Sequence, residues 1–323
     1  MNNIRKLKVT TNNGGARLDI WLRKQLTSLS RSQIQALIRT GQVTINGKRV
    51  KEHRKTRFGD EIQVIIPQQK HRILLPEPIP LDIIYQDDYL IAVNKSPGIV
   101  VHPAAGNISG TLLNALLYSF PDIAGTGNEQ RPGIVHRLDK YTSGVLMVAR
   151  NEKSYSCLIN QFKNHQIIKV YLALVHGTLK PLTGTIKTLI GRAKYDRKKM
   201  SAKPSTGRMA ITNYQTLKVF NDISLVRVQP ETGRTHQIRV HFAHAGHAVI
   251  GDTQYGKLND KTGAIPITRQ MLHAFTLKLM HPATEQQIQF KAPIPHDMAK
   301  VIEQLSGKNI AELITELQSD NQL

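Results

Sequence analysis

The feature that most constrains the fold is an apolar–polar–apolar stretch over residues 133–150. Short apolar segments edged by turn residues stand at both ends, and they are typical of buried β-strands. The polar part between them holds one carboxylate, Asp139, and four basic residues: His136, Arg137, Lys140 and Arg150. Polar groups between buried strands cost free energy unless they are paired or used. These residue types alone fit either a functional site or an ordinary loop with a surface ion pair.

The size and charge of the chain predict about two domains and a polyanionic partner. Its 323 residues include 44 Lys and Arg against 23 Asp and Glu, a net charge of +21. The excess is spread along the chain, which favours nucleic acid over a membrane. The single cysteine, Cys157, leaves no internal disulfide and suits a reducing compartment. With no secretory signal and no apolar run near about 18 residues, we expect a cytoplasmic protein without a membrane partner.

The first part of the chain predicts a small module of two helices and a hairpin. Residues 1–15 carry no strong pattern, so we expect a flexible N-terminus there. Ser30 and Gln33 form the pattern of a capping box, which predicts a second helix that ends before Gly41. A first helix is predicted by leucines at helical spacing: Leu18, Leu22, Leu26 and Leu29. Asn46-Gly47 predicts a hairpin, and a further strand is expected over 62–66.

A proline-containing polar segment over 67–80 predicts an extended linker, so we expect domains over 16–75 and 76–323. Alternating or apolar runs in the second domain predict strands over 82–85, 90–93, 167–177, 212–219, 224–228 and 272–279. Helices are expected over 111–118 and 152–164, and a tail helix over 310–317. Thr235 is suited to cap another helix, on which His236, Arg239 and Val240 would share a face.

Three separated strings in the second domain resemble motifs of one enzyme family. His136-Arg137-Leu138-Asp139-Lys140-x-Thr142-Ser143-Gly144 resembles the signature of the ribosomal pseudouridine synthases of the RluA/RluD type. Lys169-x-Tyr171-x-Ala173-x-Val175-x-Gly177 and Thr232-Gly233-Arg234-Thr235-His236-Gln237-Ile238-Arg239 are similar to two further motifs of that family. Gly251-Asp252-x-x-Tyr255-Gly256 also fits, and Lys95 to His102 is similar to a motif of structural role, with Ser96 where proline is common. The resemblance implies an α+β fold with a mixed, largely antiparallel sheet flanked by helices.

The resemblance also implies the roles of particular residues. Asp139 is the implied catalytic residue, either as nucleophile at C1′ of the ribose or as base at C2′. Arg239 is implied to pair with it, and Tyr171 to lie beside the base, where it removes the C5 proton or orients the uracil. Arg137 is the implied wedge that fills the space of a flipped-out uridine. Other RNA contacts are expected from His136, Thr142, Lys169 and Arg234.

The first module resembles the S4 RNA-binding domain, a small α/β domain, through Arg17-Leu18-Asp19 and the run from Ile38 to Gly47. Phosphate contacts are expected from five basic residues: Arg31, Arg39, Lys48, Arg49 and Arg54. The alternative is a solvated basic face of a small folded module. A basic loop over 192–199 likewise fits an RNA clamp better than a plain solvated loop.

Neither a cofactor nor a metal is expected. The chain has no dinucleotide or phosphate-binding glycine loop and no HExxH pair, and an isomerisation needs no cofactor. Four histidines lie close together in sequence, but no cysteine is near and their spacing matches no familiar ligand set. They are His236, His241, His244 and His247, with Asp252 as the only nearby carboxylate.

The S4-like module argues against the A-type enzymes, and residues 101–107 and 200–209 look most like the D type. D-type enzymes modify uridines in the helix 69 stem-loop of 23S large-subunit ribosomal RNA. The nearest alternatives are a C-type synthase acting elsewhere in that RNA, and a ribosome-assembly factor that binds rRNA with an idle catalytic fold. A hydrolase that releases uracil is a third reading. We expect a monomer that acts on large-subunit RNA or on a pre-50S particle.

Overall fold

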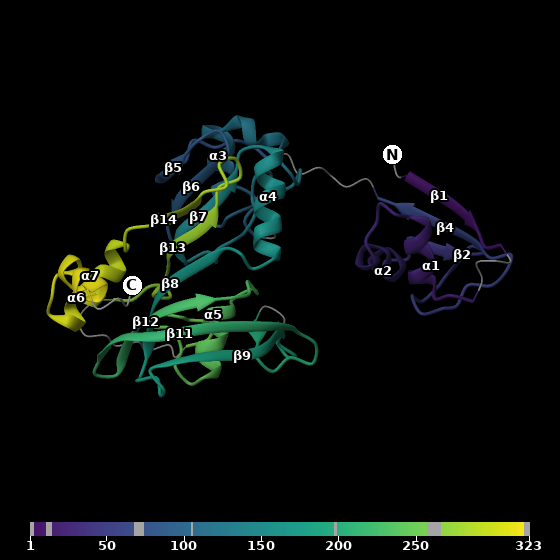
Figure 1. Ribbon diagram of the computed structural model, residues 1–323. Helices are drawn as coiled ribbons and strands as arrows, with labels where there is room; N and C mark the ends of the chain where they lie inside the picture. Colours follow the sequence, from purple (N-terminus) through teal and green to yellow (C-terminus); the bar gives the residue numbers. More distant parts are fainter. Residues whose placement is uncertain are drawn as a thin grey trace. The chain divides into compact units, whose positions relative to one another are not determined.

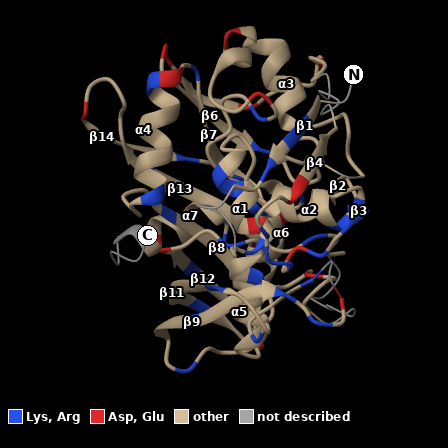
Figure 2. Cartoon of the chain, turned by 90° about the vertical axis from the view of Figure 1, so that its right-hand side faces the viewer, with Lys and Arg blue, Asp and Glu red and all other residues tan. Residues whose placement is uncertain are grey.

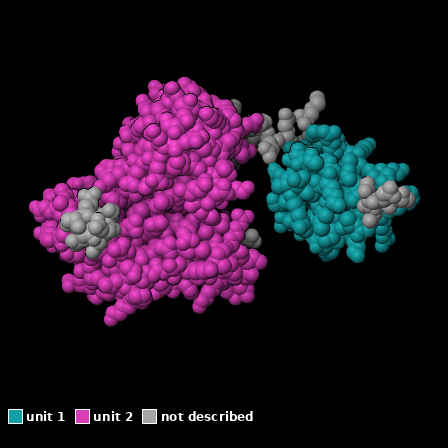
Figure 3. Space-filling view, viewed as in Figure 1, with its two compact units in different colours: residues 1–72 teal, residues 73–323 magenta. Residues whose placement is uncertain are grey.

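The protein forms two compact units, Met1–Arg72 and Ile73–Leu323, which Figure 3 colours separately. The structure is a computed structural model, and it describes residues 3–10, 15–67, 74–104, 106–196, 199–256 and 266–319. The division falls inside the segment expected to be a linker, whose residues 68–73 lie outside the described part. Each unit has its own apolar core, as a chain of this length predicts.

The first unit is a four-stranded antiparallel sheet with two helices (Figure 1). Its strands follow the order β1-β4-β2-β3. The strands are β1 Asn3–Lys8, β2 Val43–Ile45, β3 Lys48–Arg49 and β4 Glu61–Ile66, and the helices are α1 Leu18–Gln25 and α2 Arg31–Arg39. The apolar faces of both helices pack on residues of β2 and β4 in one core.

Two sequence predictions for the first unit are confirmed: the capping box of the second helix and the Asn46-Gly47 hairpin turn. The capping box forms, since the Gln33 N–H donates to Ser30 Oγ at 3.3 Å and the Ser30 N–H donates to Gln33 Oε1 at 2.6 Å. Asn46 and Gly47 have φ of 48° and 76°, which is the left-handed conformation that a two-residue hairpin turn requires.

Two expectations for this unit are wrong. Residues 3–8, expected to be flexible, form β1 and pair with β4 along their whole length. All of them except Leu7 are exposed, so this edge strand carries no alternation that the sequence could reveal. The first helix ends at Gln25, so Leu29 lies beyond it, where it packs against the core from the following turn.

The second unit is built on one ten-stranded sheet in the order β10-β9-β11-β12-β8-β13-β7-β6-β5, with β14 paired to β13. Among these pairings of described residues only β13 with β7 is parallel, so the predicted mixed, largely antiparallel sheet is confirmed. Its strands are β5 Ile83–Gln86, β6 Leu90–Lys95, β7 Ser143–Ala149, β8 Ile168–His176, β9 Thr183–Arg192, β10 Met200–Ser201, β11 Arg208–Phe220, β12 Ile223–Pro230, β13 Leu272–Met280 and β14 Gln287–Lys291.

Helices cover both faces of this sheet (Figure 1). Alternate side chains of β8 belong to two different cores. Ala173 and Val175 pack with residues of α5, whereas Leu172 and Leu174 pack with residues of α6 and α7. Residues of α3 and α4 take part in two further cores, on opposite faces of β6 and β7. The helices are α3 Leu112–Ser119, α4 Glu152–Lys163, α5 Gln237–His244, α6 His296–Ser306 and α7 Ile310–Ser319, with a 3-10 helix over Pro121–Gly125.

The central stretch is flanked by one strand, not two. All seven residues of β7 are buried, as predicted. The preceding apolar pair is not a strand, because Ile134 makes only an isolated bridge to Val148. Since β13 pairs with β7 only at Ser143 and Gly144, the far end of β7 is free to accept that single bridge.

The basic residues of the described chain are not gathered on one element. Figure 2 shows Lys and Arg spread over many helices, strands and loops. Among the helices that the structure describes, none combines the length and apolar character needed to cross a membrane.

Candidate active site

A cavity of about 520 Å³ lies in the second unit, among the loop that follows residue 135, strand β8 and the segment 230–239. The three motifs singled out in the sequence meet here, although Asp139 and Arg239 are 100 residues apart in the chain. Eight of the predicted site residues line this cavity: His136, Arg137, Asp139, Thr142, Lys169, Tyr171, Arg234 and Arg239.

Asp139 lies in a tight loop just before β7. The N–H of Thr142 donates to the Asp139 carbonyl at 3.1 Å, which closes the turn. Gly144, with φ of +111°, allows the close approach of β7 and β13, since a Cβ there would lie 2.1 Å from the carbonyl oxygen of Ala274. The carboxylate of Asp139 is 15% exposed, so it is nearly dry but open to the cavity.

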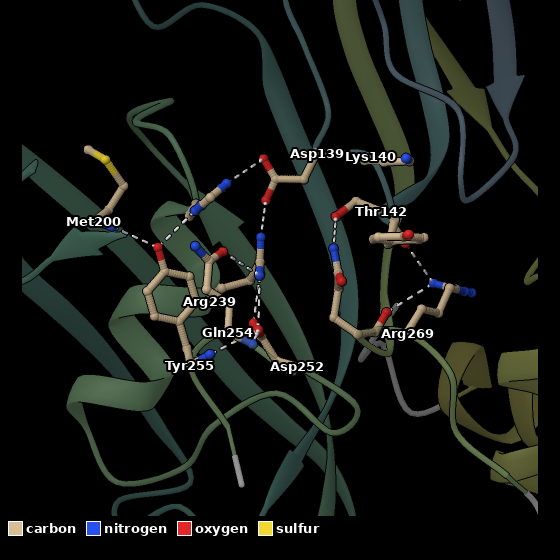
Figure 4. A network of polar contacts seen from close by, with 12 residues as sticks. Asp139, Lys140, Thr142, Met200, Arg239, Asp252, Gln254, Tyr255 and Arg269 are labelled. Carbon is tan, nitrogen blue, oxygen red and sulfur yellow. Dashed lines mark hydrogen bonds and ion pairs between the residues drawn. The ribbon is translucent and has the colours of Figure 1, made fainter. Parts of the chain in front are cut away.

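Arg239 joins Asp139 to a second carboxylate (Figure 4). Its Nη1 donates to Asp139 Oδ2 at 3.0 Å, while Nε and Nη2 donate to the two oxygens of Asp252 at 2.6 and 2.9 Å. Nη2 also donates to Gln254 Oε1 at 3.2 Å, and the guanidinium lies 5.1 Å from the ring centre of Tyr255. Burial alone would lower the pKa of Arg239, but Asp252 and Asp139 outweigh it and raise that pKa above its ordinary value. The arginine is therefore a permanent cation beside Asp139.

The start of α5 differs from the prediction. Thr235 is exposed and does not cap the helix; the N-cap is His236, with a left-handed φ of 55° and no side-chain cap bond. The side chain of Gln237 organises this turn instead, because its Oε1 accepts from the Arg234 N–H at 3.0 Å and from Thr232 Oγ1 at 2.7 Å. His236 is thus outside the helix and does not share a helical face with Arg239.

This left-handed turn brings His236 to the cavity wall. Its Nε2 lies 3.9 Å from Asp139 Oδ1, too far for a direct hydrogen bond. Its Nδ1 lies 2.8 Å from the hydroxyl of Tyr255, which accepts the N–H of Met200 at 2.9 Å. Burial lowers the pKa of His236, so the ring is neutral near pH 7.

Tyr171 and Lys169 project from β8 into the cavity. Burial, and then the charge of Asp139, raise the pKa of Tyr171, so its hydroxyl stays protonated near neutral pH. Burial lowers the pKa of Lys169 to about 8, which leaves it mostly cationic at pH 7.

His136 and Thr142 are held by the protein itself. The N–H of Met147 donates to His136 Nε2 at 2.8 Å, and the ring lies 4.8 Å from that of Phe162. Burial, and then the charge of Lys169, lower the pKa of His136 to about 3, so it carries no charge for a phosphate. Thr142 is 2% exposed and its Oγ1 accepts from Gln270 Nε2 at 3.3 Å. Both placements favour a supporting role over the predicted RNA contact.

Two basic side chains that sequence reasoning did not assign to the site, Lys95 and Arg269, hold the loop that carries Asp139. Lys95 is 1% exposed, and its Nζ donates to the carbonyls of Ser96, Ile99 and Lys140 at 2.9, 3.0 and 3.1 Å. Burial lowers the pKa of Lys95 to about 7. Arg269 Nη1 donates to the next carbonyl, that of Tyr141, at 3.2 Å. The carbonyls of the two residues after Asp139 therefore accept hydrogen bonds from two buried basic side chains.

Asp252, Gln254 and Tyr255 were also missed as site residues. Their string was noted as fitting the family, but a carboxylate 13 residues beyond Arg239 obeys no helix or strand period that links the two. Asp252 Oδ1 accepts the N–H groups of Gln254 and Tyr255 at 3.0 and 3.1 Å, which closes a compact turn. Only the folded chain shows that this turn lies against Arg239.

The predicted phosphate contacts of the first unit fall into two groups. Arg31 Nη2 lies 2.8 Å from the buried carboxylate of Asp19, and Arg54 Nη2 lies 3.2 Å from Asp60, so each is part of an internal ion pair. Arg39 and Arg49 line a cavity of about 370 Å³ together with Lys51 and His53, and both are exposed, although Arg39 Nε lies 3.8 Å from the carboxylate of Glu52 at the same cavity. Lys48 is exposed on β3.

The environment of Asp19 explains why Arg31 is held in an ion pair. Burial would raise the pKa of Asp19, but hydrogen bonds from Arg17, Arg31 and Gln35 outweigh it and place that pKa well below its usual range. Arg31 therefore helps to keep a buried carboxylate ionised.

The basic loop after β9 is described only in part, because Arg197 and Lys198 lie outside the described residues. Tyr195 is 91% exposed, with Lys194 Nζ 5.2 Å from its ring centre. Among the described residues, no group of three or more His, Cys, Asp or Glu side chains is placed to hold a metal ion. His241, considered as a ligand, lies 2.8 Å from Thr212 Oγ1 and 3.1 Å from Thr188 Oγ1.

Known proteins resemble both units. The family described as RNA pseudouridylate synthase matches residues 89–244, and the S4 domain family matches residues 16–62. An uncharacterized RNA pseudouridine synthase of Bacillus subtilis (strain 168) is 43% identical over 289 residues, which cover 90% of this chain and 94% of the relative. Ribosomal large subunit pseudouridine synthase D of Neisseria meningitidis (serogroup A) is 40% identical over 292 residues, covering 88% and 77%.

A solved structure agrees with these relatives. Human RNA pseudouridylate synthase domain containing 1 superposes with a TM-score of 0.56 at 28% identity, over 75% of this chain and 96% of that one. The fold of about three quarters of this chain is therefore shared with a protein of known structure.

Proposed function

The chain belongs to the RNA pseudouridine synthase family, and on this premise we propose that Asp139 is the carboxylate with which it isomerises uridines of large-subunit ribosomal RNA. The reaction breaks the bond from ribose C1′ to uracil N1 and joins C1′ to C5. The C5 proton leaves and N1 gains one, so atoms balance and nothing is oxidised. The observation that carries the proposal is the contact of Asp139 with Arg239 at the wall of an open cavity.

The arrangement leaves one oxygen of Asp139 available to the sugar. Oδ2 accepts from Arg239, whereas within the described part of the chain no group donates a hydrogen bond to Oδ1. An ionised carboxylate with one free oxygen can attack C1′ or remove the proton from C2′. The Arg239 guanidinium places a fixed positive charge 3.0 Å from Oδ2, on the side of the carboxylate away from the free oxygen.

Tyr171 has the chemistry to orient the uracil. Its raised pKa makes a phenolate scarce near neutral pH, so a neutral hydroxyl and an aromatic face are what it offers to the base. Of the two roles implied by the resemblance, orientation of the uracil is the one that its surroundings favour.

Capture of a flipped uridine falls to the cationic groups around the cavity. Extrusion of a base costs a few kcal/mol, and a side chain that fills the gap offsets part of that cost. Arg137 is exposed, adjoins Leu138 and Asp139 in the loop, and has a planar guanidinium that stacks on bases. Lys169 and Arg234 supply further positive charge at the same cavity.

Large-subunit RNA is the substrate that the names of the relatives favour, and its helix 69 stem-loop is the target that the resemblance to the D type implies. Proteins named ribosomal large subunit pseudouridine synthase D are 39–40% identical over 88–91% of this chain. The S4 domain adds a second basic surface suited to RNA phosphates. A C-type enzyme would share the S4 domain but would modify uridines elsewhere in the same RNA. An assembly factor with an idle site would share the S4 domain and modify no uridine.

The experiment maps products on unmodified large-subunit RNA by carbodiimide treatment and primer extension. Wild-type protein is expected to produce new stops at helix 69, and Asp139→Ala none. Stops elsewhere would assign the C type. An RNA left unchanged by wild-type protein, alone and within a pre-50S particle, would contradict the proposal, and release of free uracil would make the protein a hydrolase.

A further inference from the structure

Asp252 does not line the cavity, yet it makes more hydrogen bonds to Arg239 than Asp139 does. Its side chain is 0% exposed, so it touches neither solvent nor RNA. Two oxygens of Asp252 face two nitrogens of Arg239 in the parallel fork that carboxylate and guanidinium groups prefer. This fork leaves Nη1 as the guanidinium nitrogen that faces Asp139 (Figure 4).

The carboxylate of Asp252 is itself fixed. Its Oδ1 accepts two backbone N–H groups of its own turn, those of Gln254 and Tyr255. The same turn places the ring of Tyr255 beside the guanidinium at 5.1 Å and the amide oxygen of Gln254 on Nη2. The plane of Arg239 is thus set by one rigid turn, and a planar fork held on one side cannot rotate without breaking those bonds.

The division of charge has a chemical consequence. One guanidinium stands between two carboxylates, and its shorter, bidentate contacts go to Asp252. Asp139 receives a single hydrogen bond on Oδ2, enough to orient it without engaging both of its oxygens. An arginine without Asp252 would be free to turn and present two nitrogens to Asp139, which would occupy the oxygen that the sugar needs.

We propose that Asp252 is the positioning residue that fixes Arg239, and through it Asp139, in the reactive geometry. This inference rests on the proposed role of Asp139. It differs from a purely structural role, in which Asp252 would only hold the turn over residues 252–256 in place and would not affect the chemical step.

The test measures single-turnover rate constants at saturating enzyme, with RNA tritiated at uracil C5. The isomerisation releases that tritium, and the rate constant does not depend on the fraction of enzyme that is folded. Asp252→Asn keeps the shape of the side chain and removes its charge, and we expect the rate constant to fall by about 100-fold. The Kd for RNA should change by less than about twofold, because Asp252 is remote from solvent.

A variant that keeps the charge and a double variant distinguish a positioning role of Asp252 from a purely structural one. Asp252→Glu keeps the negative charge, and its rate constant should be at least about tenfold higher than that of Asp252→Asn. In an Arg239→Gln background, adding Asp252→Asn should change the rate constant by less than about threefold, because the partner it positions is gone. This double variant also removes the buried cation that Asp252→Asn leaves with one carboxylate partner in place of two, so it tests the inference where Asp252→Asn folds poorly.

Asp122→Asn is the matched control, since Asp122 also pairs with an arginine, Arg150, at 2.9 Å, and neither lines the cavity. It should keep the wild-type rate constant. A wild-type rate constant for Asp252→Asn, or a further large loss on adding it to Arg239→Gln, would overturn the inference. If instead Asp139→Asn were fully active, the proposed role of Asp139 would fail, whatever Asp252 does.

Discussion

The hydroxyl of Tyr255 lies 2.8 Å from Nδ1 of His236 and accepts the backbone N–H of Met200 at 2.9 Å. The hydroxyl can donate its one proton to Nδ1 while it accepts that N–H, and this arrangement has Nδ1 as the acceptor and the proton of the neutral ring on Nε2. Nε2 lies 3.9 Å from Asp139 Oδ1, a gap that one hydroxyl group of a bound ribose can bridge. With Tyr255 as the donor, His236 takes the tautomer that offers an N–H beside the acid.

Replacing Tyr255 with Phe tests this relationship. The ring beside Arg239 is kept, while the Met200 N–H and His236 Nδ1 lose a partner. We expect a loss of about 1–2 kcal/mol in the free energy of unfolding and a single-turnover rate about tenfold lower. Chemical denaturation and tritium release measure the two effects; an unchanged rate would show that the tautomer of His236 is irrelevant to turnover.

The burial of Lys95 predicts a pH-dependent stability. Its pKa falls from 10.5 to about 7 on folding, so between these values the unfolded chain binds more protons than the folded one. The contribution of Lys95 to stability should therefore rise with pH from about 7 to about 10.5, by at most about 1.4 kcal/mol per pH unit.

Lys95→Met isolates the contribution of Lys95 to the pH dependence of stability. Lys169 also has a lowered pKa, but it contributes in the same direction in both proteins. Urea unfolding at several pH values from 7 to 10 should give a shallower rise for the variant than for wild type. The variant should also be less stable at high pH, because three carbonyls lose their donor. Parallel curves for the two proteins would mean that Lys95 does not titrate in this range.

Arg39 and Arg49 should account for part of the salt dependence of RNA binding. Both are exposed at the second cavity, and each phosphate contact contributes about 0.7–0.9 to the slope of log K against log salt. Arg39→Ala with Arg49→Ala is expected to reduce that slope by about 1.5 and to leave the rate constant at saturating enzyme unchanged.

Lys6→Ala, an exposed charge on β1 of the same unit, should leave the slope nearly unchanged. If the double arginine variant and the Lys6 variant have the same slope as wild type, the surface around Arg39 and Arg49 does not touch phosphate. Equal losses in both variants would show a diffuse field instead of local contacts.

Several features of the fold could be predicted because they depend on local chemistry. Residues close in sequence determine the local backbone conformation at three places: the capping box at Ser30, the Asn46-Gly47 turn and the apolar run of β7. The meeting of Asp139, Tyr171 and Arg239 could also be anticipated, but only through the resemblance, since no local period joins residues so far apart.

What could not be predicted depends on contacts made only in the folded chain. The edge strand β1 has no apolar alternation, and its pairing with β4 exists only after the sheet forms. The left-handed His236 follows from the reach of the Gln237 side chain to Arg234 and Thr232, which replaced the expected cap by Thr235. The second carboxylate on Arg239 needs the turn over residues 252–256 to dock beside α5.

The most direct measurement compares tritium release by wild type and Asp139→Asn under single turnover, with Asp122→Asn as the control that keeps its site intact. The amide matches the carboxylate in size and can still contact Arg239, so RNA binding should persist. If Asp139 is the catalytic carboxylate, Asp139→Asn should have a rate constant lower by about 10³-fold or more, at an RNA affinity within about twofold of wild type. Tritium release by Asp139→Asn at the wild-type rate would contradict it.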